Sequence, residues 1–252
     1  KLRPGKQRTA PADAVVAQID TLVNRYGVRN IKIADEMFVL NERHVNEICD
    51  ALVERDYGLN VWAYGRVDTI TPARGERLKA AGLNWIAWCI GAARAHVRDG
   101  VDKSYDQDDI YRAVSTLHDA GIHVIGNYIF GLPDDDLASM EATLTLALEL
   151  NCEFANFYTT MAYPGSRLYE DALERGWTLP KSWSAYSQHS VDTFPLATRH
   201  LSSGEVLKFR DAAFDAYFTN PRYLEMIGRT FGGSARGEIE SMTRHKLERA
   251  IA

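Results

Sequence analysis

Polar or turn-forming residues follow each predicted strand of this 252-residue chain. They are Asp35-Glu36, Arg66 with Asp68, Gly91, Asn127 to Gly131, and Tyr163-Pro164-Gly165. An acidic pair could bind a metal or an ammonium group, an arginine could bind an anion, and an amide could bind a hydroxyl. Because the carboxyl ends of parallel strands form the functional rim of α/β folds, we expect these residues to share one concave face.

The stretch from Gly121 to Pro133 contains the most informative strand end. The run from Val124 to Phe130 is apolar except for Asn127, and Gly131-Leu132-Pro133 ends it, which is typical of a buried strand. A polar group in such a strand needs a partner, which could be backbone, water or a ligand. We expect the Asn127 amide to point into the mouth of the sheet.

Each of these residues also has an ordinary structural explanation. Asp35-Glu36 could be the N-cap and acidic first turn of a helix, and Arg66 with Asp68 could be a surface ion pair. The seven histidines show no metal-ligand spacing, and GxSxG, P-loop and HExxH motifs are absent from the sequence. The three cysteines, Cys49, Cys89 and Cys152, lie far apart without CxxC spacing, which predicts buried thiols and no metal site.

Helical and strand patterns alternate through the first two thirds of the chain. Helices are predicted over 11–26, 42–55, 71–81, 107–120, 134–150 and 166–175, and strands over 31–34, 59–64, 85–91, 124–130 and 154–160. This alternation predicts an α/β domain over 1–176 with a parallel sheet, either doubly wound or a barrel. Residues 177–252 are predicted to begin with an aromatic-rich connection, whose aromatic side chains either form a lid or pack between the barrel and the helices. Helices are then predicted at 202–218, 222–231 and 234–251.

The composition excludes several classes of protein. Hydrophobic residues make up 46% and charged residues 25%, as in ordinary globular domains, and the net charge of −5 argues against a nucleic-acid partner. No apolar run reaches the length of a membrane span and no signal-peptide pattern is present, so we expect no membrane partner and a reducing, cytoplasmic location.

Several segments together resemble one family. They are Ala34 to Arg43, Trp62 to Asp68, Leu78 to Leu83, Gly121 to Pro133, Ala162 to Tyr169, Phe209 to Asp211, Tyr217-Phe218 and Pro221 to Leu224. In this order and spacing they resemble radical S-adenosylmethionine (SAM) enzymes, particularly those with a cobalamin-binding domain. The resemblance implies a partial (β/α) barrel with about five parallel strands present, followed by an all-helical C-terminal extension.

The resemblance also implies a cofactor site. In SAM binding, Asp35 and Glu36 would hold the amino group, Arg66, Lys103 and Asn127 would line the carboxylate and ribose, and Gly131 would let the backbone approach. The implied function is radical methylation or rearrangement of a small-molecule metabolite, with a 4Fe–4S cluster and cobalamin as further cofactors.

Two departures from the family pattern limit this interpretation. The CxxxCxxC motif, whose thiolates hold the cluster, is absent, and the usual GxES appears as Gly91-Ala92-Ala93-Arg94, which lacks a polar ribose contact at Ala93. We therefore expect a piece of a larger protein that supplies the cluster loop and the cobalamin domain, and expect this chain alone to hold no cluster and to be inactive.

Two rival hypotheses remain at this stage. A degenerate barrel could bind a nucleotide-like ligand, or serve as a scaffold, without redox chemistry. Alternatively, a barrel enzyme could use Asp35 or Glu36 as a general acid or base. This role requires that the carboxyl group has a perturbed pKa and faces a pocket.

Overall fold

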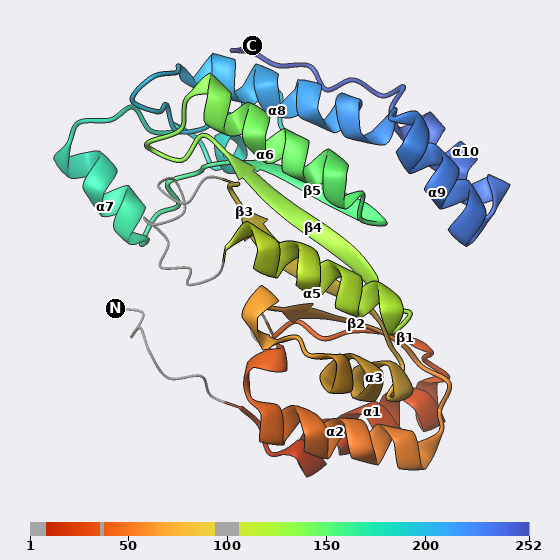
Figure 1. Cartoon of the computed structure of the whole chain (residues 1–252). Coiled ribbons are helices and arrows are strands. Elements are labelled where there is room, and N and C mark those ends of the chain that lie inside the picture. Colours follow the sequence, from red (N-terminus) through yellow and green to blue (C-terminus); the bar gives the residue numbers. More distant parts are fainter. Residues whose placement is uncertain (1–8, 36–37, 94–105, 252) are drawn as a thin grey trace. The chain divides into compact units, whose positions relative to one another are not determined.

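The structure is a computed structural model that describes residues 9–35, 38–93 and 106–251 (Figure 1). Its five strands are β1 (Asn30–Lys32), β2 (Asn60–Gly65), β3 (Leu83–Gly91), β4 (His123–Phe130) and β5 (Phe154–Thr159), in the spatial order β1-β2-β3-β4-β5. The pairings β1–β2, β2–β3 and β4–β5 are all parallel. The five parallel strands form a curled half-barrel, which confirms the predicted α/β class and partial barrel.

The chain divides into two compact units. Unit 1 contains residues 1–88 and 112–124, and unit 2 contains residues 89–111 and 125–252. The boundaries between the units fall within β3, α5 (Gln107–Asp119) and β4. Each unit has its own buried core.

Unit 1 packs amphipathic helices onto one face of β1, β2 and the first part of β3. These helices are α1 (Ala12–Tyr26), α2 (Glu42–Arg55) and α3 (Pro72–Ala80), and the short helices η1 (Phe38–Leu40) and η2 (Val67–Thr69) follow β1 and β2. The α2 N-terminus is capped by Asn41, and the Thr71 hydroxyl caps α3, whose first residue is Pro72. The predicted start of α3 is therefore confirmed.

Unit 2 contains β4, β5 and most of the remaining helices. These are α6 (Leu137–Leu150), α7 (Arg167–Glu174), η4 (Ser184–Tyr186), α8 (Ser203–Phe218), α9 (Pro221–Phe231) and α10 (Gly233–Met242). One face of β4 and β5 supplies Tyr128, Phe130 and Phe157 to an aromatic core, where Tyr217 of α8 packs against Phe157 with ring centroids 5.5 Å apart. Figure 1 shows α6 and α8 lying along these strands.

Side chains from the C-terminal region satisfy polar backbone groups along β5. The Arg210 guanidinium donates to the Phe157 carbonyl at 2.7 Å. The Gln188 amide accepts from the Thr159 N–H and donates to the Thr159 carbonyl, each at 3.0 Å. Because an open strand edge invites pairing with other chains, these contacts protect β5.

Two predictions about local structure are wrong. The helix expected over 234–251 ends at Met242, because the following residues leave the helix to contact α8 and the segment before it: Lys246 pairs with Asp215, and the Ala250 N–H donates to the Val191 carbonyl. Cys89, expected to be buried, is exposed on β3, whereas Cys49 and Cys152 are buried as predicted.

Candidate functional site

In unit 1, two of the predicted site residues lie at the carboxyl ends of adjacent parallel strands. Asp35 follows β1, and Arg66 follows β2 directly. The Arg66 guanidinium holds Asp68 in a two-point contact, with Nε–Oδ1 and Nη2–Oδ2 distances of 2.9 and 2.8 Å. About a third of each side chain is exposed, so the pair lies at the surface of unit 1.

Asp35 and Glu36 do not cap α2. Helix α2 begins at Glu42, and its cap is Asn41, whose Oδ1 accepts from the His44 N–H at 3.2 Å. Asp35 instead precedes η1, and its carbonyl accepts from the Phe38 N–H. Glu36 lies outside the described residues, as do Lys103 and Arg94.

In unit 2, Asn127 has a side-chain partner that the sequence reasoning missed. Asn127 lies opposite Asn156 in the parallel register of β4 and β5, and Asn156 Nδ2 donates to Asn127 Oδ1 at 2.8 Å. Both side chains are half-buried on the less covered face of the two strands. Since the Asn127 oxygen accepts from Asn156, its Nδ2 is the group that Asn127 can offer to an acceptor on a ligand.

Asparagine pairs of this kind also occur away from the predicted rim. At the amino ends of β1, β2 and β3, Asn60 donates to Asn30 at 2.8 Å and Asn84 donates to Asn60 at 3.1 Å. These three side chains lie at the end of unit 1 opposite the ligand rim of a parallel sheet, so they are structural. They provide a comparison for the Asn127–Asn156 pair.

Gly131 has a structural reason for being glycine. Its φ is +79°, and a Cβ atom there would lie 2.5 Å from Val206 Cγ1 on α8. The turn is held by Asp135, which is 1% exposed and accepts from the N–H groups of Gly131 and Leu132 at 3.0 and 2.9 Å. Asp135 was not among the predicted site residues, although an acid four residues after a strand-ending glycine is a sequence signal for such a turn.

The first residues after β3 are also tied down within unit 2. The Ala93 N–H, at the position where the family pattern has a polar residue, donates to Thr143 Oγ1 on α6 at 3.0 Å. The backbone at Ala93 is therefore fixed by α6.

Of the predicted site residues, unit 1 carries Asp35 and Arg66, and unit 2 carries Asn127 and Gly131. Their convergence on one face stays a prediction.

The cysteines do not form a metal-binding set. Burial raises the pKa of both Cys49 and Cys152 to about 12, so these thiols stay protonated at neutral pH, whereas a cluster needs thiolate ligands. In the described part of the chain, no group of three histidine, cysteine or acidic side chains could hold a metal ion. The donors among the described residues therefore do not fit a 4Fe–4S cluster.

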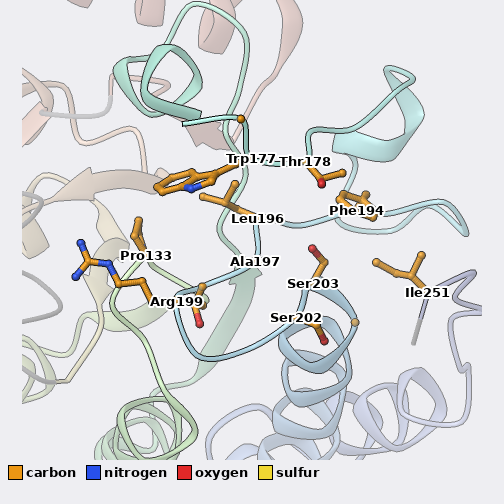
Figure 2. Close-up of a pocket in the computed structure, with 13 residues that line it drawn as sticks. Pro133, Trp177, Thr178, Phe194, Leu196, Ala197, Arg199, Ser202, Ser203 and Ile251 are labelled. Carbon is orange, nitrogen blue, oxygen red and sulfur yellow. The ribbon is translucent and has the colours of Figure 1, made fainter. Parts of the chain in front are cut away.

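A pocket of about 600 Å³ lies in unit 2 between the 177–204 segment and Ile251 (Figure 2). Figure 2 shows Trp177 and Leu196 on one side, and Ser203 and Ile251 on the other. Two of its polar lining residues are engaged within the protein: Ser202 forms a capping box with Glu205 at the start of α8, and Arg199 pairs with Asp134 at 2.7 Å.

The aromatic connection at 177–199 divides between packing and exposure. Trp177 packs against a small core of Ala162, Ala172 and Leu196, as the packing hypothesis predicted. Trp183, by contrast, is 80% exposed. Packing rather than a lid therefore explains the position of Trp177.

Asp192 accepts hydrogen bonds from serines of the same connection, and these bonds predict that stability depends on pH. Hydrogen bonds from Ser184, Ser190 and Ser182 lower the pKa of Asp192 from 3.8 to about 2. A carboxyl group with a lowered pKa stabilises the fold above its unfolded pKa, and this stabilisation is lost as the pH falls from 3.8 to about 2. We expect Asp192→Asn to lower the urea midpoint at neutral pH and to flatten its change over this acidic window. If the urea midpoint of Asp192→Asn changes with pH as steeply as that of the wild type over this window, the assignment is wrong.

No helix among the described residues is long and apolar enough to cross a membrane.

No family model matches the chain. An uncharacterized methyltransferase of Pyrococcus horikoshii is 25% identical over 224 residues, covering 88% of this chain and 48% of that protein. The anaerobic magnesium-protoporphyrin IX monomethyl ester cyclase of Rubrivivax gelatinosus is 30% identical over 216 residues, covering 84% of this chain and 38% of the cyclase. The chain thus spans less than half the length of these relatives.

A solved structure shares the fold. The radical SAM methyltransferase TsrM from Kitasatospora setae, with cobalamin and a 4Fe–4S cluster bound, superposes with a TM-score of 0.62 at 18% identity, covering 75% of this chain and 36% of TsrM. These relatives and this shared fold support the resemblance to the radical SAM superfamily that the sequence motifs indicated.

Proposed function

We propose that this chain is the SAM-binding core of a cobalamin-linked radical SAM enzyme that methylates or rearranges a small molecule. Its relatives include a methyltransferase and a cyclase, and a methyltransferase that shares the fold was solved with cobalamin bound. The observation that carries the proposal is the Asn127 amide, which is half-buried at the less covered face of β4 and fixed by Asn156. Such an amide fits a polar ligand such as the SAM ribose or carboxylate.

The residues at the rim divide the work of binding a zwitterionic nucleoside. Arg66 would bind the carboxylate of SAM, and Asp35 with Glu36 would bind its amino group, because opposite charges favour opposite ends of the amino acid. Asn127 would donate to a ribose oxygen. When bound to a reduced cluster, SAM supplies a radical that abstracts a substrate hydrogen, and this chain's part is to bind and orient the cofactor.

The cluster ligands and the cobalamin site belong, in this proposal, to parts of the enzyme outside these 252 residues. The raised pKa values of Cys49 and Cys152 and their burial support this division. The chain by itself would then bind SAM without cleaving it.

Replacing Asn127 with leucine tests the cofactor site. We expect Asn127→Leu to weaken SAM binding to this chain roughly tenfold, since one unmade hydrogen bond to a ligand costs about 1–3 kcal/mol. Because leucine is apolar and similar in size, the fold should keep most of its stability. Calorimetric titration with SAM and thermal melts of both proteins measure the two effects.

Asn60→Leu is the control, because Asn60 is hydrogen-bonded to two other asparagines, Asn30 and Asn84, at the amino end of its strand. It should leave SAM affinity unchanged. Equal affinity of wild type and Asn127→Leu, together with a large loss of stability, would make Asn127 a core residue. A wild-type chain that does not bind SAM would instead favour a scaffold role.

A further inference from the structure

A second pocket of unit 2, of about 420 Å³, runs along β5. Its lining includes Phe154, Asn156 and Tyr158 of β5, Phe214 of α8, and Met242 and Leu247 near the end of the chain. The volume falls within the range of small-molecule sites, and aromatic and aliphatic walls are typical of them. Two fused aromatic rings would fit a slot of this size and lining.

The ionic side chains of this β5 pocket are matched in charge. The two positive lining residues are Arg210 and Lys246, and the two negative ones are Asp211 and Asp215. Arg210 contacts Asp211 at 2.7 Å, and Lys246 contacts Asp215 at 2.6 Å. A charged ligand would have to break one of these pairs or enter without a counter-charge, both of which are unfavourable in a partly buried site. The pocket therefore favours an uncharged ligand.

His189 and Asn156 are two further polar residues in the lining. Burial, followed by the nearby Arg210 and Arg249, lowers the pKa of His189, so its imidazole is neutral at neutral pH. Asn156 donates one of its two Nδ2–H groups to Asn127, which leaves its amide oxygen and one N–H for a ligand. A ligand that carries a hydrogen-bond donor can use this oxygen.

We propose that the β5 pocket binds an uncharged aromatic compound that carries a hydrogen-bond donor, and that Asn156 accepts from this donor. We assign this compound as the enzyme's substrate, and this assignment rests on the proposed function. Asn156 then has two roles, because it also orients the Asn127 amide toward SAM. Its hydrogen bond to Asn127 places the substrate pocket next to the cofactor-binding residue on neighbouring strands.

Three naphthalene probes separate the parts of this proposal. The probes are 2-naphthol, which has a donor, 2-methoxynaphthalene, which has none, and 2-naphthoate, which is an anion. On the wild-type chain we expect 2-naphthol to bind roughly tenfold more tightly than either of the others, the effect of about one hydrogen bond. Calorimetry gives the affinities, and NMR shifts of the Asn156 side-chain amide and the Met242 methyl group give the location.

Two variants probe the chemistry of the pocket. In Asn156→Leu the preference for 2-naphthol over 2-methoxynaphthalene should disappear, whereas the control Asn60→Leu should keep it. In Asp215→Asn, which removes the partner of Lys246, binding of 2-naphthoate should improve several-fold. Shifts outside the pocket, equal binding of 2-naphthol and 2-naphthoate by wild type, or a preference that survives Asn156→Leu would overturn the proposal.

A parallel titration with SAM separates this inference from the proposed function. Binding of 2-naphthol at the pocket without binding of SAM would support the pocket and reject the substrate role. Binding of SAM without binding of 2-naphthol would support the proposed function and reject the pocket.

Discussion

Replacing Arg249 with alanine should lower the free energy of unfolding by about 3 kcal/mol, a typical effect of breaking a buried ion pair. The Arg249 side chain is 4% exposed and holds both Asp211 oxygens, at 2.8 and 3.0 Å. Its other donors bind the Ser190 and Gln188 carbonyls and the Thr193 hydroxyl at 2.9–3.1 Å. The alanine variant leaves these acceptors without their donor, and the connection before α8 loses its link to the end of the chain.

Two further variants make the Arg249 result interpretable. Arg244→Ala removes an exposed arginine five positions earlier and should change stability by less than about 0.5 kcal/mol. Arg249→Lys keeps the charge but not the planar fork, so its loss should be intermediate. Urea unfolding curves of the three variants measure these differences. An Arg249→Ala curve that coincides with the Arg244→Ala curve would show that the contacts of Arg249 contribute nothing to stability.

Arg249 also illustrates why the sequence mispredicted the end of the chain. A helical pattern over 234–251 favours a single helix, and the periodicity of side chains gives no sign of contacts with residues 30 to 60 positions away. The contacts of Lys246 with Asp215 and of Arg249 with Asp211 outweigh the local preference, so α10 ends at Met242. By contrast, α2 matches its prediction because its periodicity and its stop lie within the same few residues.

The candidate site shows the same division between local and distant information. The order of strands and turns predicted which residues follow the strands, because alternation of helix and strand requires parallel pairing. The partner of Asn127 was not predicted, because Asn156 lies 29 residues away and becomes its neighbour only through the β4–β5 register. Which residues follow the strands can thus be predicted from topology, whereas side-chain partners depend on register.

Gly131 has been given two explanations, and a substitution separates them. The family resemblance assigns it to backbone approach by SAM, whereas the structure gives it a positive φ and contact with Val206. We expect Gly131→Ala to lower the free energy of unfolding by about 3–4 kcal/mol. Of this, about 1 kcal/mol comes from the left-handed backbone, and the rest comes from the clash with Val206, which is fully buried and has a stiff β-branched side chain.

Gly165 offers a closely matched control for this substitution. Its φ is +86°, close to the +79° of Gly131, but a Cβ atom there would meet nothing within 4 Å. Gly165→Ala should therefore cost only the backbone term, about 1 kcal/mol. Urea unfolding of the two variants gives the clash with Val206 as the difference between them. If the two losses are equal, packing against α8 does not explain Gly131, and the role in SAM binding becomes the better explanation.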